Sequence, residues 1–282
     1  MPYSEKNLEL PSIIKVKKGN NIPRMKLYHP KFVGNHSIIY YGSYRSYDTC
    51  FVKKYVYGSY SSSKIILINE LKIYKKIFKC DKFIRFYKAI IVSKSECMLI
   101  MEPMTFGDLS SHGLKGDLIG ISQIRSVMKD LIGGLKYLEG KKIILRNISL
   151  NHILKQYLFS NLFSVKLSNF TCAVDLNESP QPTDKVGNYL YYSPEAIAEL
   201  PQGFYTDLWC VAVCIYMVAT HTHPFISNIH CNEEEREQLI FWCKFSEQSK
   251  FETITDPSIK MFILSTLTKS PLFRIRVSKI II

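Results

Sequence analysis

The first part of the chain predicts a small sheet. Short runs rich in β-branched and aromatic residues alternate with turn residues, a pattern typical of strands. The runs are Ile38–Tyr44, Cys50–Val56, Phe83–Val92 and Cys97–Met101. Between the second and third runs, residues 64–79 repeat isoleucine at helical spacing after three serines that can cap a helix. We therefore expect four strands and one helix in this part of the chain.

The remainder of the chain predicts helices. One apolar stripe has the spacing of a core-facing helix, and its members are Ile124, Val127, Leu131, Leu135 and Leu138. The run Leu208–Ala219 is apolar on all sides and predicts a buried central helix. A further helix is expected after Asn232, a capping residue followed by three acids, and to continue through Leu239–Phe245. Strands first and helices later indicate an α+β chain.

Residues 1–30 predict an irregular extension because they contain four prolines, at positions 2, 11, 23 and 30. A single domain is then expected over residues 31–282. The chain does not begin with a secretion signal. Its longest apolar run has twelve residues, and a membrane span needs about 18 or more. We therefore expect no membrane insertion.

The composition limits the classes of partner that the chain is expected to bind. The 282 residues carry 37 Lys and Arg against 24 Asp and Glu, a formal net charge of +13. The basic residues are spread out, without a run interleaved with aromatics, so a solvated basic surface is favoured over nucleic-acid binding. The eight cysteines form no Cys-x-x-Cys pair, which favours a reduced compartment. A metal site at His221, His223, His230 and Cys231 is the weaker alternative to an ordinary loop around Pro224.

Several motifs then follow in an order that resembles a protein kinase domain over about residues 31–277. Gly34 and Ser37 match the second and third positions of a glycine-rich phosphate loop, and Phe32 occupies the first. Lys53 is the last residue of a Cys-Phe-Val-Lys motif within the expected strand Cys50–Val56, and Glu70 follows 17 residues later. The resemblance implies a bilobal fold, with a small β-rich lobe over 31–104 and a larger helical lobe over 105–282. It also implies a nucleotide pocket at Lys53, Glu70 and Met101.

The catalytic loop of that family reads His-Arg-Asp-Leu-Lys-Pro-x-Asn. Here Arg146 is kept, but Asn147 stands at the catalytic Asp, Ser149 at the Lys and His152 at the metal-binding Asn. An amide cannot act as a general base near neutral pH. The resemblance therefore implies that this loop holds no catalytic residue.

The metal-binding motif departs in the same way. Asn169-Phe170-Thr171 stands where the family has Asp-Phe-Gly. Magnesium is a hard cation that prefers carboxylate oxygen, so the resemblance implies no metal site. We expect an inactive member that requires no cofactor, while weak, metal-independent ATP binding stays open.

The scaffold motifs are retained. Ser193-Pro194-Glu195 matches Ala-Pro-Glu, and Asp207-Leu208-Trp209 opens the predicted central helix. Arg274 matches the late arginine that pairs with the glutamate of the first motif. We therefore predict a buried Glu195–Arg274 ion pair and structural roles for Arg146, Glu195, Asp207 and Arg274.

A narrower resemblance is to the poxvirus homologues of the pseudokinase domain of mixed lineage kinase domain-like protein. It rests on residues 36–44, 165–170 and 189–194, and on heavy use of Ile, Lys, Tyr and Asn. It implies a decoy in the host cell cytoplasm that sequesters host receptor-interacting protein kinase 3 and inhibits necroptosis. The 30 residues before the domain are too few for the helical bundle of the cellular effector. Leu200, Phe204 and Tyr205 are candidate partner contacts, with ordinary packing as the alternative.

Two alternative functions stay open. In the first, the chain is an atypical active serine/threonine kinase; in the second, it is a pseudokinase that regulates another kinase allosterically. The activation segment, residues 172–192, bears on regulation because Ser179 and Thr183 are not adjacent. A phosphorylation switch on neighbouring hydroxyls is therefore not expected, and a static decoy is favoured.

Overall fold

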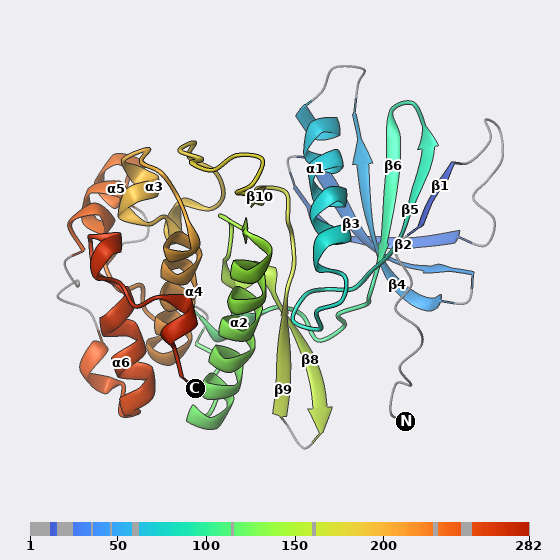
Figure 1. Cartoon of the computed structure of the whole chain (residues 1–282). Coiled ribbons are helices and arrows are strands. Elements are labelled where there is room, and N and C mark those ends of the chain that lie inside the picture. The colour runs from blue at the N-terminus through green and yellow to red at the C-terminus, as the bar shows by residue number, and fades with distance from the viewer. Residues whose placement is uncertain are drawn as a thin grey trace. The chain divides into compact units, whose positions relative to one another are not determined.

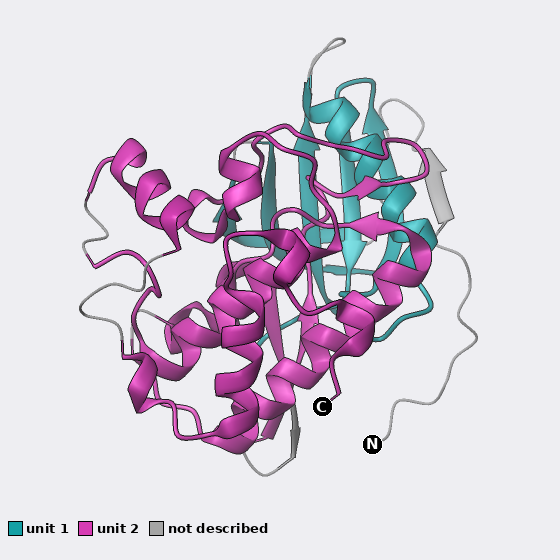
Figure 2. Ribbon diagram, turned by 60° about the vertical axis from the view of Figure 1, so that its left-hand side comes forward, with its two compact units in different colours: residues 1–105 teal, residues 106–282 magenta. Residues whose placement is uncertain are grey.

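The computed structural model describes residues 12–15, 25–34, 36–45, 47–57, 62–113, 116–159, 162–227, 231–243 and 250–281. The chain forms two compact units, residues 1–105 and residues 106–282 (Figure 2). Unit 1 is a sheet with one helix, and unit 2 is mainly helical, so the expected α+β class is confirmed.

Unit 1 contains a six-stranded sheet in the order β1-β5-β6-β4-β3-β2 (Figure 1). Its strands are β1 (Ser12–Lys15), β2 (Met25–Val33), β3 (Ser37–Tyr44), β4 (Tyr47–Val56), β5 (Phe86–Ser93) and β6 (Glu96–Met101). Neighbouring strands are antiparallel, except that β1 pairs parallel to β5. The helix α1 spans Ser62–Ile77. The four expected strands and the expected helix are confirmed, although β5 begins three residues later than predicted.

The sheet starts earlier than the expected domain boundary, so the extension over residues 1–30 needs correction. Residues 25–30 belong to β2, which pairs with β3, and residues 12–15 form β1. The alternation of polar and apolar residues is weak in β2 because it is an edge strand whose side chains are almost all exposed. Pro30 lies at a register shift, where a missing backbone donor is tolerated.

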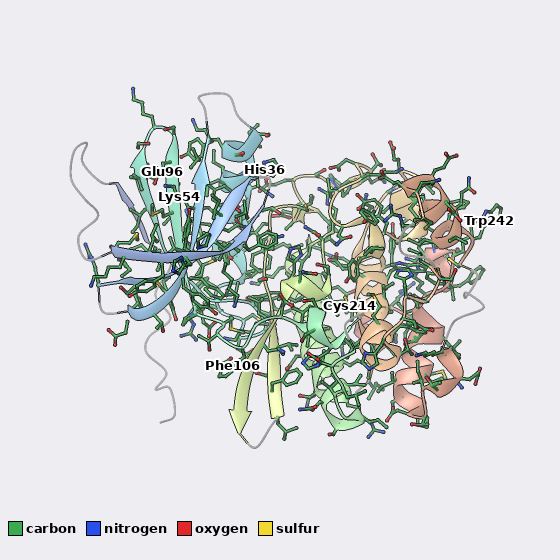
Figure 3. All side chains as sticks on the ribbon, turned by 180° about the vertical axis from the view of Figure 1, so that it is seen from behind. His36, Lys54, Glu96, Phe106, Cys214 and Trp242 are labelled. Carbon is green, nitrogen blue, oxygen red and sulfur yellow. The ribbon has the colours of Figure 1, made fainter. Side chains whose placement is uncertain are left out.

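The two faces of the sheet in unit 1 bury different side chains. Cys50 and Val52 of β4 lie on one face, in an apolar cluster with Tyr44, Ile90, Met98 and Ile100. Lys54 shares that side and pairs with Glu96 at 3.1 Å (Figure 3). The alternate residues of β4 point to the opposite face, because side chains alternate along a strand. On that face, α1 contacts Lys53 and Tyr55 through Glu70.

Unit 2 is built around α4 (Phe204–Thr220), whose residues 206–218 are all buried. It packs against α2 (Ile121–Lys141) and α6 (Pro257–Thr266) (Figure 1). The predicted stripe of α2, from Ile124 to Leu138, is buried, and the predicted central helix is confirmed. The described part of the chain contains no helix long and apolar enough to span a membrane.

Shorter elements complete unit 2. They are the strand pairs β7 (Ile143–Ile144) with β10 (Val174–Asp175) and β8 (Ile153–Phe159) with β9 (Leu162–Leu167), and the helices α3 (Pro194–Ile197) and α5 (Glu233–Trp242). The single-turn helices are η1 (Leu109–His112), η2 (Leu150–His152), η3 (Tyr189–Tyr191), η4 (Phe251–Thr253), η5 (Pro271–Phe273) and η6 (Val277–Lys279). Asn232 caps α5 by accepting the Glu235 N–H at 2.8 Å, as predicted. The expected continuation is confirmed as far as Trp242, and Cys243, with a left-handed backbone, ends the helix. Residues 244 and 245 lie outside the described residues.

Candidate functional site

Unit 1 presents a buried lysine–glutamate pair. The Nζ of Lys53, on β4, lies 2.9 Å and 3.0 Å from the two carboxylate oxygens of Glu70, on α1. Lys53 is 4% exposed and Glu70 is 0% exposed. The two sequence-predicted residues are therefore brought together, and α1 is held against β4.

Tyr55 adds a third member that the sequence analysis missed. It lies two residues after Lys53, on the same face of β4, and its hydroxyl donates to Oε2 of Glu70. Burial, and then the charge of Glu70, raise the pKa of Tyr55 well above its usual range, so the hydroxyl stays a donor. The period of two along a strand, counted from Lys53, is the signal that would have found it.

Met101 lies on the next strand of the sheet, β6, directly opposite Phe51. Its sulfur accepts a hydrogen bond from the hydroxyl of Tyr74, on α1, at 3.2 Å. Burial raises the pKa of Tyr74 as well. The third residue of the expected nucleotide pocket is thus engaged by α1.

In unit 2, the first two residues of the expected catalytic loop are held by a side chain of the central helix, α4. The carboxylate of Asp207 accepts the N–H of Leu145 at 2.6 Å and that of Arg146 at 2.7 Å. Complete burial raises the pKa of Asp207 to about 6, against the lowering effect of these two bonds. The carboxylate thereby determines the position of the loop relative to α4.

Arg146 connects the loop to the activation segment. Its backbone is left-handed, with a φ of 61°. Its guanidinium donates to the carbonyl of Cys172 at 2.9 Å and to the carboxylate of Asp184 at 2.6 Å. One buried cation therefore holds the start and the middle of the segment.

Asn147 is turned toward the same segment. Its Nδ2 lies 3.8 Å from the sulfur of Cys172, and its Oδ1 is buried with no hydrogen-bond partner among the described residues. Gly187 comes close to this amide: it has a φ of 99°, and a Cβ there would lie 2.8 Å from the carbonyl of Arg146. Only glycine accommodates both conditions. The Asn147 oxygen is thus not available at the surface to a reacting hydroxyl.

The other substituted positions form one hydrogen-bond chain. The Nδ1 of His152 lies 2.9 Å from the carbonyl of Asn147 and 3.0 Å from the hydroxyl of Ser149. Because a carbonyl can only accept, Nδ1 carries the proton in the neutral ring, and Nε2 is left as an acceptor. The Nδ2 of Asn169 lies 2.9 Å from that Nε2.

Asn169 completes the chain through its oxygen. Its Oδ1 accepts a hydrogen bond from the Thr171 hydroxyl at 3.1 Å, and its backbone is left-handed, with a φ of 63°. The two atoms that could bind a cation, Nε2 of His152 and Oδ1 of Asn169, therefore already accept hydrogen bonds. Asn147, Ser149, His152 and Asn169 are all brought together, as the motifs predict.

The predicted Glu195–Arg274 ion pair is confirmed. It is bidentate, at 2.7 Å and 2.8 Å, with side chains 3% and 0% exposed. The Thr206 hydroxyl donates to the same carboxylate at 3.0 Å. The guanidinium also donates to three carbonyls, those of Tyr205, Thr268 and Lys269. The pair connects α3 to the C-terminal part of unit 2.

The three candidate partner residues differ in exposure. Leu200 is 54% exposed, whereas Phe204 and Tyr205 are partly buried. The hydroxyl of Tyr205 donates to the carbonyl of Pro201 at 2.6 Å. Leu200 is therefore the member of the three that offers a broad apolar contact.

The alternative metal site has no support in the described residues, where no three His, Cys, Asp or Glu side chains come together. His223 is buried: its Nε2 donates to the carbonyl of Leu190 at 2.8 Å, and its Nδ1 accepts the N–H of Phe225 and of Ile226. His221 bonds through Nδ1 to the carbonyl of Gly113. His230 lies outside the described residues.

Comparison with known proteins places these motifs in a family. The protein kinase domain model matches residues 33–281. The chain is 29% identical over 201 residues to the probable serine/threonine-protein kinase fhkB of Dictyostelium discoideum, covering 68% of this chain and 17% of that protein. It is 23% identical over 242 residues to the serine/threonine-protein kinase STE20 of Candida glabrata, covering 77% and 26%. It is 28% identical over 166 residues to the mouse serine/threonine-protein kinase Nek10, covering 57% and 14%. The chain thus spans about a quarter or less of the length of these relatives.

Removing the buried cation should destabilise unit 2 strongly. We expect Arg274→Ala to lower the free energy of unfolding by about 3–5 kcal/mol, because Glu195 is left charged and uncompensated. Urea unfolding measures the change. Lys260→Ala is the control, since it breaks the exposed pair with Glu252 and should cost less than about 1 kcal/mol. Equal losses in the two variants would contradict the assigned role.

His223 should make the protein acid-sensitive. Burial lowers its pKa from 6.5 to about 4, so the neutral ring contributes stability above pH 6.5 that is lost as the pH falls toward 4. The loss relative to His223→Gln should reach about 3 kcal/mol, at 1.36 kcal/mol per pKa unit. Urea unfolding at several pH values measures it. Asp207 titrates in both proteins and cancels in the difference. Parallel pH profiles would refute the prediction, and His29→Gln, in exposed β2, is the matched control.

Proposed function

Because the chain belongs to the protein kinase family, we propose that it is a catalytically inactive member that acts by binding another kinase. The observation that carries this proposal is the internal hydrogen-bond chain of unit 2, which occupies the positions where catalysis and metal binding take place. The fold is kept, while the chemical groups are replaced and turned toward the protein itself.

The first support is the absence of a base in the catalytic loop. Asn147 has no titratable group, and its buried oxygen lies beside Gly187. Phosphoryl transfer uses a carboxylate at this position to orient the substrate hydroxyl and to accept its proton. An amide can orient a hydroxyl but cannot take the proton.

The second support concerns magnesium. The residues present do not fit this cation, because His152 and Asn169 supply one nitrogen and one neutral oxygen, and no carboxylate. Both acceptors are engaged by hydrogen bonds from the chain. Binding a cation at Nε2 of His152 would first break its hydrogen bond with Asn169, and the neutral ligands would offset none of the cation's charge. We therefore propose that the chain requires no metal or other cofactor.

The third support is the activation segment, which unphosphorylated side chains hold in place. Asp184 pairs with Arg146, and Lys185 pairs with Glu237 of α5 at 3.0 Å. The guanidinium of Arg236 also lies 4.2 Å from the ring of Tyr189. The carboxylate of Asp184 thus supplies the negative charge that a phosphate group supplies in kinases activated by phosphorylation of this segment. The arrangement favours a static binding surface over a regulated one.

We propose that the partner is the host receptor-interacting protein kinase 3. The chain acts as a viral decoy that sequesters this kinase in the host cell cytoplasm, and necroptosis is thereby inhibited. The poxvirus resemblance supports this identification. The exposed Leu200 lies three residues after the end of α3, and its N–H donates to the carbonyl of the buried Glu195 at 2.9 Å, so it offers an apolar contact on a supported backbone. Rigid, well-supported apolar side chains are typical anchors of protein interfaces.

The alternative function is an atypical active serine/threonine kinase. The Lys53–Glu70 pair favours it, because active kinases require this contact. An allosteric regulator of another kinase is compatible with the same contact. The two experiments below separate these functions.

The chain should transfer no γ-phosphate. We expect incorporation of labelled phosphate into a general protein substrate to equal the background of an Asn147→Ala preparation, with magnesium or manganese present. Transfer above background that Asn147→Ala or Lys53→Ala removes would establish the active-kinase alternative. The Asn147 variant is the sharper control because it leaves the buried Lys53–Glu70 pair intact.

The intact chain should capture receptor-interacting protein kinase 3 from a purified mixture. Leu200→Asp should weaken this binding by about tenfold or more, because it places a charge in an apolar contact. Leu264→Asp, on α6 and 47% exposed, is the matched control and should bind normally. Absence of binding by the intact chain would remove the decoy function and leave the catalytic result unaffected. Capture with an increased activity of the bound kinase would favour the allosteric regulator.

A further inference from the structure

One face of the sheet in unit 1 carries a row of large side chains beside Lys53. Phe51 lies two residues before Lys53, so both point to the same face, about 7 Å apart along β4. In the register of the sheet, Tyr41 of β3 and Met101 of β6 lie directly opposite Phe51. Three bulky side chains therefore form a row across three strands, next to the lysine.

The row is fixed by specific contacts. The rings of Tyr41 and Phe51 are tilted by 53° with centroids 4.9 Å apart, which is a favourable aromatic geometry. The Nζ of Lys31, on β2, donates to the hydroxyl of Tyr41 at 2.8 Å. The same Nζ lies 4.7 Å and 5.5 Å from the centroids of the two rings. Phe51 is consequently 4% exposed.

The other side of Lys53 along the strand is filled as well. Tyr55 is fully buried, and its ring centroid lies 5.3 Å from the Nζ of Lys53. Its hydroxyl is bonded to Glu70. Lys53 is thus flanked by an aromatic ring two residues before it and another two residues after it, both held by hydrogen bonds or ring contacts.

The kinase motif at this strand is Val-Ala-Ile-Lys, and its lysine binds the phosphates of ATP. In this chain Phe51 stands at the alanine. A nucleotide whose phosphates bind Lys53 has to place its sugar or base on the same face of the strand. Phe51 is only two residues from Lys53, so the sugar or base would lie at its position. An alanine leaves that space open, and the Phe51 ring occupies it.

We propose that Phe51 decides whether unit 1 can bind a nucleotide: its ring, locked by Tyr41 and Lys31, closes the face beside Lys53 to purine nucleotides. Replacement by alanine would open that face, with Lys53 still in place to pair with phosphate. The proposal concerns ligand binding and goes beyond the proposed function, which holds whether or not a nucleotide binds.

The test uses the full chain and a fluorescent ATP analogue, titrated in EDTA and again with magnesium. The wild-type chain should show no saturable binding up to millimolar ligand. Phe51→Ala should bind at least about tenfold more tightly than the wild type. Unlabelled ATP and ADP should displace the analogue and should raise the melting temperature of the variant only.

Two controls locate the effect. Val52→Ala truncates the neighbouring residue, which lies in the apolar cluster on the opposite face, and should gain no binding. Phe51→Ala combined with Lys53→Met should lose the gained binding. If Phe51→Ala does not fold, Phe51→Val removes the ring while keeping a residue that favours strands.

Saturable binding of ATP to the wild-type chain, with or without magnesium, would overturn the proposal, and so would a folded Phe51→Ala or Phe51→Val variant that binds no nucleotide. Neither result would touch the absence of phosphoryl transfer or the capture of a partner kinase.

Discussion

The arrangement of unit 2 depends on one buried carboxylate. Asp207 is at the start of the central helix and accepts the backbone N–H groups of Leu145 and Arg146. The two bonds are short and charge-assisted, and they hold a loop whose Arg146 has a left-handed backbone. From there Arg146 reaches the activation segment and Asn147 reaches Cys172. The loop keeps its conformation because it is determined by α4, and the residues that would perform chemistry contribute little to it.

This dependence explains how the chemical residues can change without loss of the fold. Asp207, Glu195 and Arg274 are buried, and removing any one of them leaves a buried charge or unpaired backbone groups. Asn147, His152 and Asn169 are only partly buried, and each has a partner close by in the chain's own loops. The structural residues are thus constrained by burial, whereas the catalytic positions are constrained only by catalysis. The proposed function, binding without catalysis, requires only the first set.

The parts of the fold that could be predicted from the sequence are those in which burial imposes a period. The stripe of α2 and the central residues of β4 and β6 are buried, and the apolar run of α4 is buried on all sides. The edge strand β2 could not be found in this way because its side chains are exposed. In the site, motif order identified Lys53, Glu70, Glu195 and Arg274. It could not identify Asp184 or Gly187, whose roles depend on contacts that the chain order does not encode. Finding Tyr55 requires the period of two along the strand in addition to the motif.

The remaining question is at which site the binding of a ligand would give a net favourable free energy. The polar atoms of Ser149, His152 and Asn169 already have intramolecular partners, and the oxygen of Asn147 is buried. Lys53 is held by both oxygens of Glu70. A small polar ligand would exchange one hydrogen bond for another of similar strength, and the net contribution of such an exchange is small. Apolar side chains that remain exposed on a rigid base, such as Leu200, have no internal partner of this kind. Burying them removes apolar surface from water, which is a net gain. This difference supports the proposed association with another protein over the alternative of an active kinase.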